Sequence, residues 1–116
     1  MDFHIPHIDG SFLPEEILKR DGSNYVDWCW RLRNVLGIHD LVHVMEGPLD
    51  DAPPWDSDIR VLEEYVDALN NTIAVRTLMH ATMAPHWQNY YQNYTPYEMV
   101  VALIMLFGPQ ARMQET

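Results

Sequence analysis

The fold class follows from residues 23–37, which read SNYVDWCWRLRNVLG. Apolar side chains recur in this stretch at spacings of three and four, at Tyr25, Trp28, Leu32 and Val35/Leu36. This spacing places them on one face of an α-helix. Ser23 or Asn24 is a favoured N-cap, and Gly37 is the expected end of the helix. Residues 23–37 therefore predict an amphipathic first helix.

Four further helices are expected after it. A short helix over 39–45 should end at Gly47-Pro48, and another is predicted over 84–92. The longest, over 58–82, should be capped by Asp56 or Ser57. Its apolar residues form two stripes, which predicts a central helix with neighbours on both sides. The stripes are Ile59, Leu62, Val66, Leu69 and Ile73, and Val61, Tyr65, Ala68, Val75 and Met79.

The clearest local signal opens the last helix, over 96–107. Thr95-Pro96-Tyr97-Glu98 combines an N-cap threonine, a proline at the first helical position and a glutamate three residues after the cap. This is the arrangement of a capping box. Gly108-Pro109 should end the helix. We therefore predict an all-α fold, a single compact domain of about five helices over residues 23–107.

The remaining segments are expected to be irregular. Residues 1–22 should form an N-terminal arm, with one helical turn at Pro14-Glu15-Glu16. Its apolar side chains, which are expected to tie part of it to the domain, are Phe12, Leu13, Ile17 and Leu18. Residues 46–57 contain three prolines and four acids, which predicts a loop with Trp55 as its one large anchor. Residues 108–116 should form a short polar tail.

Charge and composition exclude several classes of protein. The 116 residues carry 7 basic and 17 acidic side chains, a net charge of −10 with the histidines neutral. Phosphate backbones are bound by clustered Lys and Arg, so we expect no direct binding of nucleic acid. The longest apolar run, 99–107, is far shorter than the roughly 20 residues of a membrane span, so no membrane segment is expected. With one cysteine and no signal-peptide pattern in residues 1–19, we expect a cytoplasmic protein.

No set of residues predicts catalysis, a metal site or a cofactor. His39 and His43 share a helix face, but a zinc site needs a third and usually a fourth ligand. Cys29 is expected to be a small buried hydrophobe, as helical cysteines usually are. The aromatic series Trp87, Tyr90, Tyr91, Tyr94 and Tyr97 favours helix packing, with a protein-binding surface as the alternative. The sequence therefore predicts a protein that is not an enzyme.

The chain resembles a known family. Residues 18–28 read LKRDGSNYVDW and are followed by Leu32-Arg33 and Val35-Leu36. This is similar to the start of the capsid region in the gag polyprotein of copia-type LTR retrotransposons of plants. The likeness continues in order to about residue 113, through Val44-Met45-Glu46, Pro48-Leu49, the loop to Trp55, Ala81-Thr82-Met83, the aromatic segment, Pro96-Tyr97-Glu98, Leu103 and Leu106-Phe107.

The resemblance implies the amino-terminal capsid domain, an α-helical module that self-associates into the shell around retrotransposon RNA. Gly22, Asn24, Tyr25 and Trp28 would be its structural signature, the turn and aromatic anchor of the first helix. A full gag protein continues into a second helical domain and a basic CCHC zinc knuckle. One cysteine cannot supply the knuckle, so RNA packaging does not carry over. A piece of a longer gag and a host-adopted, domesticated gag fragment are both left open.

These observations predict a capsid-derived protein–protein interaction module that self-associates or binds another protein. The main alternative is a host-adopted gag fragment that acts as a regulator, a toxin/antidote-type partner or an inhibitor of a distinct cellular protein. A small hydrolase or metal-binding protein is the second alternative. The candidate contact residues are Trp30, Trp55 and Tyr91, and Trp30 should be exposed because it lies about 200° around the helix from Trp28.

Overall fold

The computed structural model describes residue 8 and residues 12–114 of the chain. The elements in chain order are the 3₁₀ helix η1 (Pro14–Glu16), α1 (Tyr25–Ile38), the 3₁₀ helix η2 (Val42–Met45), α2 (Ile59–Ala81), α3 (Pro85–Tyr90) and α4 (Pro96–Gln114). The described residues form no strand. The all-α prediction is therefore confirmed, with four α-helices in place of the five expected.

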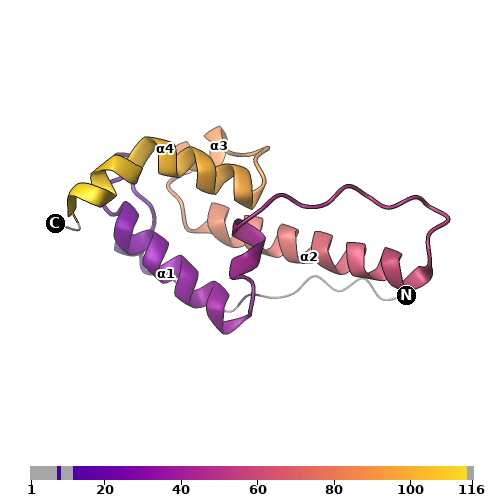
Figure 1. The fold of residues 1–116 in the computed structure, drawn as a ribbon. Coiled ribbons are helices and arrows are strands. Elements are labelled where there is room, and N and C mark those ends of the chain that lie inside the picture. The colour runs from indigo at the N-terminus through magenta and orange to yellow at the C-terminus, as the bar shows by residue number, and fades with distance from the viewer. Residues whose placement is uncertain (1–7, 9–11, 115–116) are drawn as a thin grey trace.

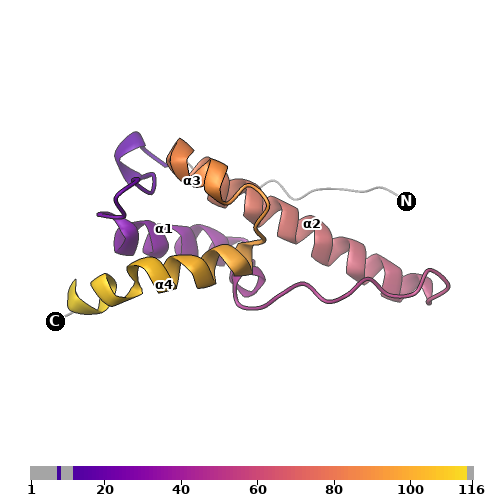
Figure 2. The same ribbon diagram turned by 90° about the horizontal axis from the view of Figure 1, so that it is seen from above.

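The helices gather at one end of α2. Helices α1 and α4 lie side by side, and both pack near the C-terminal half of α2, where α3 follows (Figures 1 and 2). The core consists of side chains from all four helices and the segments that join them. Its members are Leu18, Trp28, Leu32, Leu36, Leu41, Met45, Val75, Leu78, Met79, Met83, Trp87, Tyr91, Met99, Leu103 and Phe107.

The prediction that α2 is packed on both sides along its length is wrong for its N-terminal half. Only its last two turns are buried, at Ala74, Val75, Leu78 and Met79. Ile59 and Val61 are exposed, because this half extends past the other helices beside the loop of residues 46–58 (Figure 1). The helix also begins one residue later than predicted, since Asp58 is the N-cap and its carboxylate accepts the Arg60 N–H at 2.8 Å.

The end of α1 corrects two predictions. Gly37 does not end the helix, and the expected helix over 39–45 is only the short turn η2. Asp40 has a φ of 57°, the Leu41 N–H donates to the Leu36 carbonyl at 2.8 Å, and the Asp40 N–H donates to the Gly37 carbonyl at 3.2 Å. This is a Schellman motif. An aspartate therefore occupies the left-handed position that glycine usually holds.

Replacing Asp40 by glycine should raise the free energy of unfolding by about 0.5–1 kcal/mol. Glycine adopts a positive φ without a Cβ penalty, and the change removes a negative charge from the C-terminal end of α1, where the helix dipole disfavours it. Urea denaturation measures the difference. Asp40→Ala is the matched control, because it removes the charge and keeps the Cβ. Equal stability of the two variants would contradict the assignment of the motif.

Helix α4 begins as predicted but ends later. The Thr95 N–H donates to a Glu98 carboxylate oxygen at 3.0 Å, and the Glu98 N–H donates to the Thr95 hydroxyl oxygen at 3.2 Å, which completes the capping box. Gly108-Pro109 does not end the helix, which continues to Gln114. A proline removes only one helical donor, and the following QARMQ consists of strong helix formers. Most of the predicted polar tail is therefore helical.

Leu18 makes the main attachment between the described part of the N-terminal arm and the helices. Leu18 is fully buried, and its N–H donates to the Thr82 carbonyl at 2.8 Å while its carbonyl accepts the Ala84 N–H at 2.9 Å. Phe12 and Ile17 are half-buried, whereas Leu13 is exposed and anchors nothing. The predicted turn at Pro14–Glu16 is present as η1. Segment 12–22 is thus held against the junction of α2 and α3.

Candidate functional site

Gly22 forms the turn that the resemblance implies, and its position tolerates no side chain. Its φ is +70°, and a Cβ placed there would lie 2.2 Å from the Phe107 ring. A positive φ disfavours every residue with a Cβ. The backbone at Gly22 therefore packs directly on the aromatic end of α4.

Asn24 joins the arm to the start of α1. It occupies the N-cap position, but its side chain does not cap the helix. Instead, the amide oxygen accepts the Lys19 N–H at 2.9 Å, and the amide nitrogen donates to the Ile17 carbonyl at 2.7 Å. A carboxamide supplies both an acceptor and a donor, as this position requires.

Tyr25 and Trp28 attach α1 to the rest of the core. The Tyr25 ring lies 5.4 Å from the Phe107 ring, centroid to centroid. Trp28 is buried, and its indole N–H donates to the Thr82 hydroxyl at 3.0 Å. The four signature residues Gly22, Asn24, Tyr25 and Trp28 therefore have structural roles in joining the arm, α1, α2 and α4.

The prediction that Tyr91 contacts another protein is wrong, because its side chain is fully buried. It follows α3, and its ring stacks on Trp87 at a centroid distance of 5.7 Å. Burial raises the pKa of Tyr91 to about 12. Its hydroxyl has no hydrogen-bond partner within the described part of the chain. The aromatic segment therefore packs α3 against the core, as the helix-packing interpretation predicted.

Trp30 and Trp55 do lie on the surface. Trp30 is 65% exposed, which confirms the prediction from its angle around α1. Trp55 is 90% exposed, so it is not the anchor of its loop. The loop is instead closed locally by the Ser57 N–H, which donates to the Pro54 carbonyl at 3.0 Å. Both tryptophans are available for contact with another molecule.

The outer face of α4 is an apolar surface that sequence reasoning missed. We use this name for Val101 and Met105, which point away from the buried face formed by Met99, Leu103 and Phe107. Val101 is 40% and Met105 is 77% exposed. The signal was present in the sequence, because residues 99–107 are apolar at every position. A helix that is apolar all round is normally buried on all sides.

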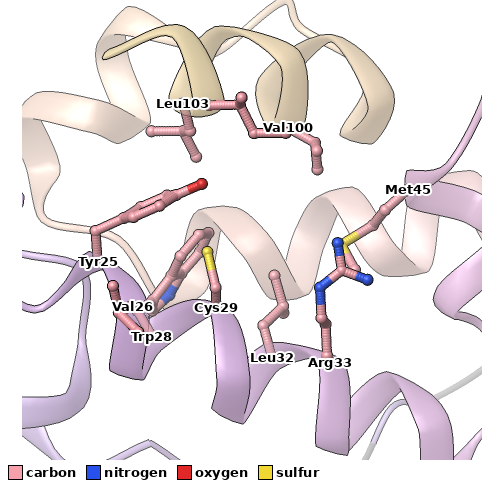
Figure 3. Close-up of a pocket in the computed structure, with 10 residues that line it drawn as sticks. Tyr25, Val26, Trp28, Cys29, Leu32, Arg33, Met45, Val100 and Leu103 are labelled. Atoms are coloured by element: carbon pink, nitrogen blue, oxygen red, sulfur yellow. The ribbon is translucent and has the colours of Figure 1, made fainter. Parts of the chain in front are cut away.

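A cleft separates the inner faces of α1 and α4 (Figure 3). We call it the α1–α4 cleft. It has a volume of about 190 Å³ and is lined by Tyr25, Val26, Trp28, Cys29, Leu32, Arg33, Met45, Val100, Leu103 and Ile104. The Cys29 sulfur, the Tyr25 hydroxyl and the Arg33 guanidinium all point toward the open space (Figure 3). Burial raises the pKa of both the Tyr25 hydroxyl and the Cys29 thiol, so both are neutral near pH 7.

Burial disfavours the thiolate form of Cys29. A nucleophilic cysteine needs a lowered pKa, and that of Cys29 is raised by burial. Across the described residues, no three His, Cys, Asp or Glu side chains lie close enough to hold a metal ion. In the same part of the chain, no helix has the length and apolar character that crossing a membrane requires.

Most of the negative charge lies in one segment of the chain. Residues 46–67 hold eight acidic and one basic side chain, a net of −7 out of the −10 of the chain. They comprise the exposed loop and the N-terminal half of α2. A groove of about 400 Å³ between them is lined in part by Asp50, Glu64 and Asp67. In contrast, residues 96–108 contain a single charged side chain, Glu98.

Comparison with known proteins identifies no relative. No protein-family model matches the chain, and no characterised protein or solved structure matches it.

Proposed function

We propose that this chain is a non-enzymatic protein-interaction module that self-associates through the outer face of α4. The observation that carries the proposal is an unbroken apolar stretch of α4, residues 99–107, that is covered on one side only. Val101 and Met105 face outward from a helix whose other side forms the core. Removing such side chains from water is favourable, at about 25 cal/mol per Å² of apolar area.

A second copy of the chain is the partner that the charge distribution favours. Two copies carry −10 each, so their surfaces repel one another in general. The repulsion is weakest where α4 meets α4, because the outer face bears no charge and most of the acidic segment 46–67 extends away from α4 along the loop and the N-terminal half of α2 (Figure 1). A two-fold contact would bury the same patch on both copies. Self-association is also what the resemblance to copia-type gag capsid domains implies.

The exposed tryptophans support a second candidate, contact with a different protein. Trp30 lies on α1 and Trp55 in the loop, so neither belongs to the outer face of α4. Tryptophan is enriched among residues that dominate binding energy. A host-adopted gag fragment that regulates or inhibits another protein would use such a surface.

Aspartate substitutions on the outer face should dissociate the oligomer. We expect the variant Val101→Asp/Met105→Asp to weaken self-association at least about tenfold, or about 1.4 kcal/mol, because the interface would bury unpaired carboxylates. Sedimentation equilibrium of the whole chain measures it. Val61→Asp is the matched control: Val61 is 45% exposed, similar to Val101 at 40%, and lies on the N-terminal half of α2.

The salt dependence separates an apolar contact from a charged one. For an apolar α4–α4 contact, added salt should strengthen self-association, because it screens the repulsion between two acidic chains. A strict monomer at about 200 µM, near the weak end of specific association, would overturn self-association and favour a heterologous partner. Equal dissociation by Val61→Asp and by the α4 variant would overturn the assignment to α4.

A further inference from the structure

The α1–α4 cleft lies between two helices and is partly open to solvent, so a small molecule can reach it. The cleft has a volume of about 190 Å³ and lies between two helices whose inner faces form the core. An engineered apolar cavity of about 150 Å³ is enough to bind benzene. The cleft therefore has room for one aromatic ring or a short alkyl chain.

The walls of the cleft are apolar over most of their area. Leu32 projects from α1 and Val100 and Leu103 project from α4 on the opposite side (Figure 3). Trp28 closes the inner end, and its only polar atom is already bonded to Thr82. The walls thus favour a hydrocarbon or an aromatic ring.

The edge of the cleft carries one positive charge. Arg33 lines the cleft, and no carboxylate within residues 12–108 forms an ion pair with it. The neighbouring arginine on α1, Arg31, differs in that it pairs with Glu16. An unpaired guanidinium beside an apolar wall offers two parallel N–H donors, which match a carboxylate. The Tyr25 hydroxyl, also on α1, interacts with the Cys29 side chain, so Arg33 is the charged group that the cleft offers to a ligand.

We propose that the α1–α4 cleft binds a small monocarboxylate with an apolar body, its carboxylate on Arg33 and its body between Leu32, Val100 and Leu103. A carboxylate fits better than a phosphate ester, because one arginine balances one negative charge and the chain as a whole carries −10. The size of the cleft limits the ligand to roughly a dozen non-hydrogen atoms, and such ligands bind with Kd values of about 0.1–1 mM. Val101 and Met105, through which self-association is proposed, do not line the cleft.

The binding experiment compares acids with alcohols of the same shape. The probes are 3-phenylpropionate and octanoate, against 3-phenylpropan-1-ol and octan-1-ol, and the two acids distinguish an aryl from an alkyl body. Nuclear magnetic resonance titration follows the indole N–H of Trp28 and the amides of α1 and α4. Alkylation of Cys29, the single cysteine, gives a second measure, since a ligand in the cleft should slow it at least threefold.

Two variants and one control assign the contacts. Arg33→Gln should reduce the preference for acid over alcohol at least fivefold and leave the binding of the alcohol unchanged. Val100→Trp should fill the cleft and abolish the protection of Cys29 by every probe. Arg31→Gln should change neither, because Arg31 pairs with Glu16. Thermal unfolding checks that each variant is folded.

Two results would overturn the proposal: equal binding of acid and alcohol by the unmodified protein, or protection of Cys29 that survives in folded Val100→Trp. The Val101→Asp/Met105→Asp variant tests whether ligand binding depends on the oligomer. We expect it to bind the probes as the unmodified protein does, because Val101 and Met105 do not line the cleft. Failure of self-association would therefore leave this proposal intact, and its own failure would leave self-association intact.

Discussion

Gly22→Ala should destabilise the fold by roughly 3–5 kcal/mol, a large part of the 5–15 kcal/mol that typically stabilises a domain. Two costs add at this residue. A φ of +70° is strained for alanine, and the new Cβ would lie 2.2 Å from Cε1 and 2.4 Å from Cζ of Phe107. Overpacking against a ring in the core forces the backbone or the ring to move. Chemical denaturation at 25 °C measures the loss.

Gly37→Ala is the matched control for this substitution. Gly37 lies inside α1, and nothing lies within 4 Å of a Cβ placed on it. Alanine there should stabilise the fold by about 0.5 kcal/mol through helix propensity. In a Phe107→Leu background, the cost of Gly22→Ala should shrink, because the clashing ring atoms are absent. A Gly22→Ala protein within 1 kcal/mol of the unmodified chain would contradict this account of the turn.

The elements predicted correctly depend on neighbours in the sequence. The capping box at Thr95 and Glu98 needs only two hydrogen bonds across three residues, so it is visible in the sequence. The exposure of Trp30 likewise follows from its angle around one helix. In contrast, Gly37 was misjudged because the end of α1 is determined by Asp40, whose positive φ is unusual for an aspartate.

The predictions that failed depend on contacts between distant segments. Tyr91 resembles a surface tyrosine in the sequence, but in the fold it belongs to the same core cluster as Leu18 and Met45, which are far away along the chain. The apolar stripes of α2 are identical in character along the helix, and only the positions of α1, α3 and α4 decide which half is buried. The α1–α4 cleft depends on the distance between two helices, and the spacing of apolar residues along the sequence does not predict that distance. The exposure of Trp30 was therefore predictable from the sequence, whereas the exposed loop position of Trp55, the outer face of α4 and the cleft were not.

Trp28→Ala should destabilise the fold by about 3–5 kcal/mol, whereas Trp30→Ala should change the free energy of unfolding by less than about 0.5 kcal/mol. The two tryptophans differ by two positions in one helix, so propensity and composition change equally. Trp28 is 1% exposed and Trp30 is 65% exposed. Denaturation of both variants under the same conditions measures the difference. Equal losses would show that the arrangement of α1 on α2 and α4 is wrong.

The hydrogen bond between Trp28 and Thr82 allows the energetic coupling of the two side chains to be measured, which the Trp28→Ala variant alone does not give. The Thr82 hydroxyl accepts the indole N–H at 3.0 Å and donates to the Met79 carbonyl at 3.1 Å, and both side chains are buried. The Thr82 carbonyl also accepts the Leu18 N–H, so this residue connects α1, α2 and the arm. A double-mutant cycle of Trp28→Phe and Thr82→Val should give a coupling energy of about 1 kcal/mol. Additive losses would mean that the two side chains act independently.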